Sequence, residues 1–157
     1  MVAHALKYRG VIQEIGSMVP GFLQFLPYGM LILFDETAPA ELRSLSLVHN
    51  GTELVSELTA GDYVKFSPPA ASEQPQSYRL PALGERGMPE TDAQEPQWYR
   101  VTAVGESVNA NLAKLGHVVI HFDGATTANL PGAISVEPEL EAIPTVGTYF
   151  EFFGLKE

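Results

Sequence analysis

Short apolar runs, separated by glycine and proline, recur along the whole chain. Within several runs the apolar and polar positions alternate, which is typical of strands that bury one face. Glycines and prolines, 14 and 12 in number, supply turns between the runs. The pattern predicts strands at Tyr8–Ile15, Met30–Phe34, Leu45–His49, Tyr63–Phe66, Tyr99–Val104, Val118–Phe122, Ala133–Val136 and Tyr149–Phe153.

Helical spacing is confined to two short segments. Val108, Leu112 and Leu115 recur at the helical period, with Ser107 placed to cap the start and Gly116 placed to end the helix. We therefore predict a helix over residues 108–115 and at most one helical turn over Pro39–Leu42. One short helix among so many strands predicts an all-β fold, either a barrel or a sandwich.

A weak internal repeat favours the barrel. TAGDYVKF at 59–66 resembles TVGTYFEF at 145–152, and LILFD at 31–35 resembles VIHFD at 119–123, in the same order. Two similar halves that together form one closed or nearly closed β-barrel would produce this repeat. A length of 157 residues fits a single domain, 1–157, in which Tyr63 and Tyr149 occupy corresponding places.

Residues 67–97 differ in kind from the rest of the chain. They hold many prolines and show no hydrophobic periodicity, so we predict an inserted surface loop between two strands. A binding arm is the alternative interpretation of the same segment.

Charge and composition exclude several classes of function. Nine lysines and arginines against 19 aspartates and glutamates give a net charge of −10, which argues against nucleic acid and anionic membrane surfaces as partners. The absence of cysteine excludes disulfides and thiolate chemistry. The longest apolar run, MLILF, is too short to cross a membrane, and the N-terminal segment does not resemble a signal peptide. We expect a cytoplasmic location.

Familiar enzyme and metal motifs are missing from the sequence. It contains no GxSxG, HExxH or phosphate-binding GxxxxGK[ST] pattern. The histidines of HVVIH, His117 and His121, would lie roughly 13 Å apart on a strand, too far to share one metal ion. We expect neither a metal nor a cofactor.

Histidine is the side chain whose ordinary pKa lies near neutrality. We expect His4, near the terminus, to be inert, and His121 to be a hydrogen-bonded histidine of the barrel. His117 follows Gly116, where a histidine interacts favourably with the helix dipole.

His49 precedes Asn50-Gly51, a dipeptide that favours a two-residue hairpin of type I′. Such a turn would place His49 at the rim of a hairpin, ordered but open to solvent. A neutral imidazole in that position can act as a nucleophile towards a phosphoryl group, or it can be functionally silent.

The sequence resembles a known family through its two halves. The C-terminal match is VTAVGESVNANLAKLGHVVIHFDG followed by PGAISVEPELEAIPTVGTYFEF, and the N-terminal match is GMLILFDETAPAELRSLSLVHNGTEL. In these stretches the chain resembles the IIA component of the glucitol/sorbitol-specific bacterial phosphotransferase system (PTS). Members of this family accept a phosphoryl group on a histidine from the phosphocarrier HPr. They pass it to a cysteine of the IIB component, which phosphorylates the polyol during uptake.

The resemblance places the phosphorylated histidine at His49 and makes His117 a candidate for a supporting role. A second histidine of the family's segment is replaced, since Asn50 and Gly51 follow His49, and Gln97 stands where the family often has a histidine. The alternative function is a non-catalytic β-barrel binding or regulatory module that keeps the scaffold without phosphotransfer. The replaced histidine and the 67–97 insertion are the features that favour this alternative.

Overall fold

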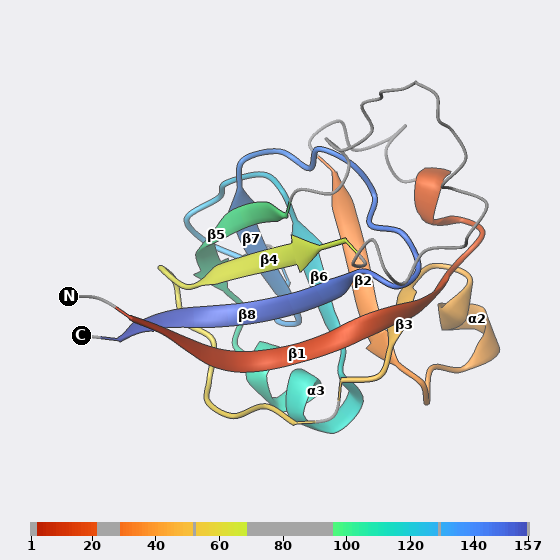
Figure 1. Cartoon of the computed structure of the whole chain (residues 1–157), viewed down its shortest axis with the longest axis horizontal. Coiled ribbons are helices and arrows are strands. Elements are labelled where there is room, and N and C mark those ends of the chain that lie inside the picture. The colour runs from red at the N-terminus through yellow and green to blue at the C-terminus, as the bar shows by residue number, and fades with distance from the viewer. Residues whose placement is uncertain (1–2, 22–28, 52, 69–95, 129, 157) are drawn as a thin grey trace, which may run out of the picture.

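The strands close into one barrel. The computed structural model describes residues 3–21, 29–51, 53–68, 96–128 and 130–156. Around the barrel the strands follow the order β1-β3-β2-β6-β7-β5-β4-β8 (Figure 1). Their bounds are β1 Ala3–Ile15, β2 Met30–Asp35, β3 Leu47–His49, β4 Tyr63–Ser67, β5 Gln97–Val104, β6 Val118–His121, β7 Ala133–Glu137 and β8 Tyr149–Lys156. The predicted strands and the closed β-barrel are confirmed.

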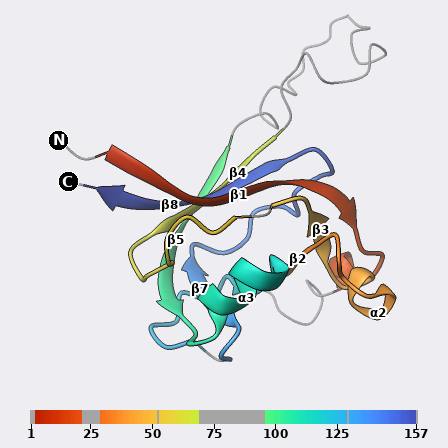
Figure 2. The ribbon, with the colours of Figure 1, turned by 90° about the horizontal axis from the view of Figure 1, so that it is seen from below.

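Three short helical elements accompany the strands. They are the 3-10 turn η1 Val19–Gly21 and the helices α2 Ala40–Arg43 and α3 Val108–Leu115. Helix α3 has the predicted bounds, and it buries Val108 and Leu112 in the core at one end of the barrel (Figures 1 and 2). Gly116 ends the helix in the left-handed conformation, at φ +58°. Ser107 stands at the N-cap position, but its side chain makes no capping hydrogen bond there.

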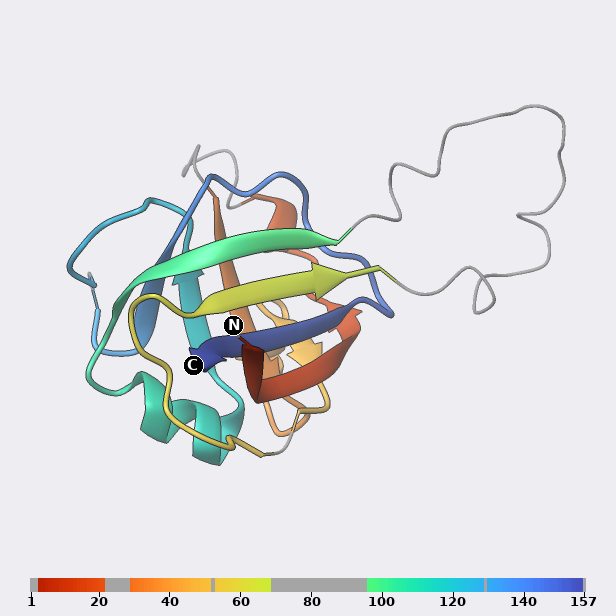
Figure 3. The same cartoon turned by 60° about the vertical axis from the view of Figure 1, so that its left-hand side comes forward.

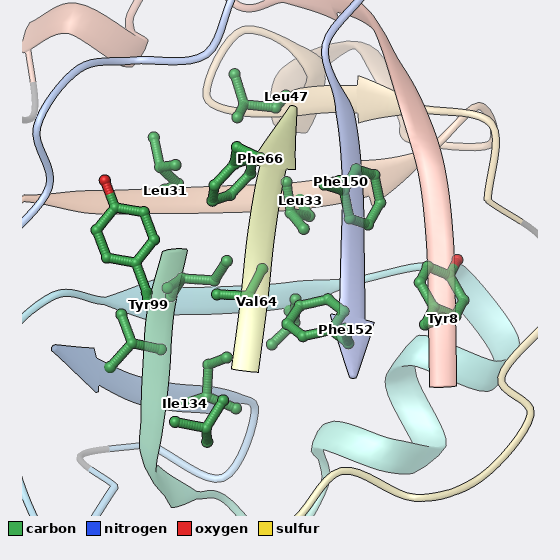
Figure 4. Close-up of a cluster of buried hydrophobic side chains, with 14 of the residues drawn as sticks. Tyr8, Leu31, Leu33, Leu47, Val64, Phe66, Tyr99, Ile134, Phe150 and Phe152 are labelled. Carbon is green, nitrogen blue, oxygen red and sulfur yellow. The ribbon is translucent and has the colours of Figure 1, made fainter. Parts of the chain in front are cut away.

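The barrel interior is filled by alternate residues of the strands. In β4 the burial alternates along YVKFS, so that Val64 and Phe66 point inward. Figure 4 shows the inward side chains meeting between the strands, with Tyr8, Phe150 and Phe152 side by side on β1 and β8. The ring centroid of Tyr8 lies 6.1 Å from that of Phe150 and 6.5 Å from that of Phe152. Each such buried ring contributes about 1.5–3 kcal/mol to stability.

The two halves of the chain contribute equivalent strands. Exchanging β1–β4 for β5–β8 leaves the order around the barrel unchanged, and the parallel pair β2–β3 becomes the parallel pair β6–β7. Tyr63 pairs with Phe153 of β8, and Tyr149 pairs with Ser67 of β4. The two tyrosines therefore take symmetrical places on each other's strand, as the repeat predicts.

Strands β4 and β5 border the segment that the sequence predicts to be a loop. They lie side by side and antiparallel, with Phe66 opposite Gln97 (Figure 3). Ser67 and Gln97 belong to the strands, so the strands extend into both ends of the predicted 67–97 loop. Residues 69–95 lie outside the described residues.

Candidate active site around His49

His49 is the last residue of β3 and lies inside the molecule. Its neighbours across the sheet are Ile12 of β1 and Asp35 of β2. The exposed fraction of His49 is 0%. The expectation of a solvent-open histidine at a hairpin rim is wrong, because β3 lies between two other strands and the following chain covers its end.

Both ring nitrogens of His49 are hydrogen-bonded to the backbone. The amide of Gly51 donates to Nδ1 at 2.9 Å, and Nε2 lies 2.7 Å from the carbonyl oxygen of Gly116. A carbonyl only accepts, so Nε2 carries the proton and Nδ1 holds the lone pair. The two glycines thereby select one neutral tautomer of the ring.

Aromatic rings and small residues surround this imidazole. The ring of Phe150 meets it edge to face with a centroid distance of 4.8 Å, and Tyr8 does so at 6.0 Å. A Cβ atom added to Gly116 would lie 2.8 Å from Cε1 of His49. Only glycine combines the left-handed backbone at position 116 with this close approach.

The surroundings keep His49 uncharged. Burial lowers its pKa below the ordinary value of 6.5, and the Gly116 carbonyl and the charges of Asp35 and Glu36 only partly oppose this effect. Burial, assisted by the charge of Asp35, raises the pKa of Tyr8 to about 12. At neutral pH the site therefore holds a neutral imidazole beside a protonated phenol.

The chain after β3 does not turn back as a type I′ hairpin, so that prediction is wrong. Gly51 lacks the positive φ that this turn requires. Instead, Oδ1 of Asn50 accepts a hydrogen bond from the Val11 amide at 2.9 Å, and the Val55 amide donates to the Lys7 carbonyl at 2.7 Å. These bonds hold residues 50–51 and 53–55 along β1, and in this covering segment Gly51 lies against Nδ1 of His49.

A surface groove runs between β1 and this covering segment. It encloses about 480 Å³, and its lining includes Tyr8, Gly10, Asn50 and Glu53. The groove therefore reaches the tyrosine that packs against the imidazole.

His117 lies beside the site but does not bond to the candidate nucleophile. Its Nδ1 is 3.1 Å from the Leu33 carbonyl, and its ring packs on Phe34 at a centroid distance of 4.7 Å. Gly116, the preceding residue, makes the contact with His49. The His117 ring thus anchors the backbone next to Gly116 onto β2.

Comparisons with known proteins agree on one family. The family model described as "PTS system glucitol/sorbitol-specific IIA component" matches residues 7–73 and 93–151. The glucitol/sorbitol-specific EIIA component of Escherichia coli K12 is 31% identical over 150 residues, covering 96% of this chain and 97% of that protein. Its counterpart from Shigella flexneri is 32% identical over the same share of each chain. The chain belongs to the glucitol/sorbitol-specific IIA family of the PTS.

A solved structure supports the fold of this IIA protein. The crystal structure titled as a PTS system IIA component from Enterococcus faecalis V583 has a TM-score of 0.63 and 20% identity. The similarity covers 92% of this chain and 98% of that one. His49, Gly51, Gly116 and Tyr8 all lie within the ranges that the family model matches.

The other histidines of the IIA protein have different surroundings. His121 is buried, and neither of its ring nitrogens has a hydrogen-bond partner, so the expectation of a hydrogen-bonded barrel histidine is wrong. His4 lies in β1, opposite Leu155 of β8. No group of three potential metal ligands, and no helix long and apolar enough to cross a membrane, occurs among the residues that the structure describes.

Two contributors to the site are not identified by sequence reasoning. The sequence pattern places Tyr8 only at the start of a predicted strand and Gly116 only at the end of a predicted helix. Their contacts with His49 join residues far apart in the sequence, which no local pattern indicates. Gly51 was expected in a turn, and its amide instead bonds to the histidine two residues earlier.

Proposed function

We propose that this IIA protein is a cytoplasmic phosphocarrier that accepts a phosphoryl group from HPr on His49. It then passes the group to a cysteine of the IIB component, for uptake and phosphorylation of glucitol or sorbitol. The observation that carries the proposal is the tautomer of His49, which is neutral and has its lone pair on Nδ1. A neutral imidazole is the form that attacks phosphorus.

Nδ1 is the acceptor atom in this proposal. Its lone pair forms the new P–N bond as the bond between phosphorus and the donor's nitrogen breaks, and that electron pair returns to the donor's imidazole. The proton on Nε2 stays in place, held by the Gly116 carbonyl. No other proton has to move, because the donor leaves as a neutral imidazole and His49 becomes the phosphorylated cation. The charges of Asp35 and Glu36 favour that cation.

The Gly51 amide changes partner in this step. It now donates to Nδ1, and attack on phosphorus requires that this bond be released. The freed N–H then points towards the phosphoryl oxygens, where it stabilises their charge. The covering segment must open locally for the donor to reach the ring, and the groove beside Tyr8 and Asn50 is the route of approach.

His117 has a supporting role in this scheme. Its ring fixes the backbone that follows Gly116, and so it holds the carbonyl that selects the tautomer of His49. We expect His117→Gln to slow labelling without abolishing it. Labelling that is lost in this variant and kept in His49→Gln would move the acceptor role to His117.

One observation favours the alternative of a binding or regulatory module. The imidazole is fully buried, and both of its nitrogens are engaged in hydrogen bonds. If the covering segment never opens, no donor reaches Nδ1, and the barrel keeps the family's scaffold without the transfer.

Labelling separates the two functions. The protein is incubated with HPr, enzyme I and labelled phosphoenolpyruvate, and acid-labile, base-stable phosphate is measured. A phosphocarrier becomes labelled and His49→Gln does not, whereas a binding module stays unlabelled. Full labelling of His49→Gln would contradict the assignment to His49.

A further inference from the structure

The hydroxyl of Tyr8 is a buried polar group without a partner. The residue is 1% exposed, and no hydrogen bond reaches its oxygen in the structure. Buried hydroxyls are normally hydrogen-bonded, because removing them from water otherwise costs free energy. Phenylalanine would fill the same aromatic space without that cost. The oxygen therefore calls for an explanation other than packing.

The position of this oxygen is next to the two glycines that bond His49. A Cβ atom added to Gly51 would lie 2.8 Å from the Tyr8 oxygen, and one added to Gly116 would lie 3.0 Å from it. Figure 4 shows the Tyr8 side chain on β1 beside β8, and the ring lies edge to face with the imidazole. The hydroxyl thus lies beside both of the glycines whose backbone groups hydrogen-bond to the imidazole.

The other buried polar atoms without a partner among the described residues belong to His121 and Ser135. These two residues pair with each other in β6 and β7. Tyr8 is distinguished from them by its packing against the imidazole and by its place in the groove.

We propose that the Tyr8 hydroxyl donates a hydrogen bond to an oxygen of the phosphoryl group carried by His49. The inference rests on the proposed phosphocarrier function. The partner that the hydroxyl lacks in the free protein arrives with the phosphoryl group, beside the Gly51 amide released from Nδ1. Two donors then face the charge that the group brings into an apolar site. The raised pKa of Tyr8 keeps the phenol protonated and able to donate.

The test compares Tyr8→Phe with wild type in the transfer from phosphorylated HPr. Since the hydroxyl has no partner in the free protein, the midpoint of unfolding should stay the same or rise. The labelling rate should fall by about a hundredfold to a thousandfold, as expected on removing one donor to developing charge. The 31P resonance of the phosphohistidine should also shift, which a purely structural role for the hydroxyl would not cause.

Tyr99→Phe is the matched control. Tyr99 is also buried, but its hydroxyl bonds to Gln97 at 2.8 Å and accepts from the Glu141 amide at 3.2 Å. This variant should lose stability and keep the wild-type labelling rate. Equal labelling rates and equal 31P shifts for Tyr8→Phe and wild type would overturn the role of Tyr8 alone. Absence of labelling in wild type would overturn the phosphocarrier function, and the Tyr8 proposal with it.

Discussion

At the scale of single residues, the site depends on backbone groups more than on side chains. The amide of Gly51 and the carbonyl of Gly116 set the tautomer of His49, and both belong to residues without a side chain. Backbone groups suit this task because each is a strong hydrogen-bonding group that does not titrate. The tautomer of His49 is therefore set by the backbone at Gly51 and Gly116.

The pH dependence of stability should report the buried imidazole. An unfolded histidine has a pKa of about 6.5, and burial lowers the pKa of His49 in the folded protein. Below about pH 6.5 the unfolded chain therefore binds a proton that the folded ring does not, so the free energy of unfolding falls as pH falls. The stabilisation is fully present above that pH and is lost on going down towards the lowered pKa.

Urea titrations of wild type and His49→Gln, between about pH 5 and 8, measure this effect. As the pH drops below about 6.5, the free energy of unfolding of wild type should fall more steeply than that of His49→Gln, which has no imidazole at this position. Curves that stay parallel over the whole range would show that His49 titrates normally in the folded protein.

Gly116→Ala should disturb both stability and labelling. An alanine pays about 1–2 kcal/mol for the left-handed backbone, and its Cβ would also press on Cε1 of His49. Gly124→Ala is the control, because Gly124 has a similar φ of +64° and its nearest contact would be 3.7 Å away. Denaturant titration should show a larger loss for Gly116→Ala, together with slower labelling. Equal losses for the two variants would exclude a packing role for Gly116 at the histidine.

At the scale of elements, the pairing of β4 with β5 leads us to predict that the intervening segment can be replaced. Phe66 and Gln97 are paired across the two strands, so a short turn is enough to connect them. Replacing residues 69–95 by a four-residue glycine-rich turn should leave the free energy of unfolding unchanged or raise it by up to about 1–2 kcal/mol, because a shorter loop costs less entropy.

Chemical denaturation of the shortened protein tests this expectation. A control of the original length, with 69–95 replaced by glycine and serine, separates the effect of loop length from that of loop composition. A loss of several kcal/mol in both variants would show that the native segment packs on the barrel.

The strands and the helix could be predicted from the sequence where neighbouring residues alone determine the structure. Strand alternation and the helix-ending Gly116 predict the strands and α3, and the internal repeat favours a barrel over a sandwich. The Asn50-Gly51 signal failed because a tertiary bond, from the Val11 amide to the Asn50 side chain, holds the chain along β1 instead. The burial of His49 results from that path, so its environment could not be deduced although the family resemblance indicated the residue itself.

At the scale of the whole molecule, the two halves are alike in topology and different in chemistry. In the first half Ile12 of β1 pairs with His49, and in the second half Val101 of β5 pairs with Val136. A β-bulge follows Ile12 in β1, and a β-bulge follows Val101 in β5. With the two bulges aligned, Val136 occupies the position in β7 that His49 occupies in β3. The repeat therefore supplies a closed scaffold with His49 in one half.

The net charge of −10 also acts at the level of the whole protein. It disfavours retention of a doubly charged phosphoryl group and attracts partners that carry a basic docking face. Both effects suit a carrier that passes the group on.

Mapping the phosphoryl group in the wild-type protein tests whether His49 carries it, without a substitution that disturbs the buried site. After phosphorylation through enzyme I and HPr, trypsin at neutral pH releases residues 44–65, in which His49 is the only histidine, and residues 115–156, which hold His117 and His121. Mass spectrometry should find one phosphoryl group on the peptide 44–65. A phosphoryl group on 115–156, or on neither peptide, would contradict the assignment of His49 as the phosphoryl carrier.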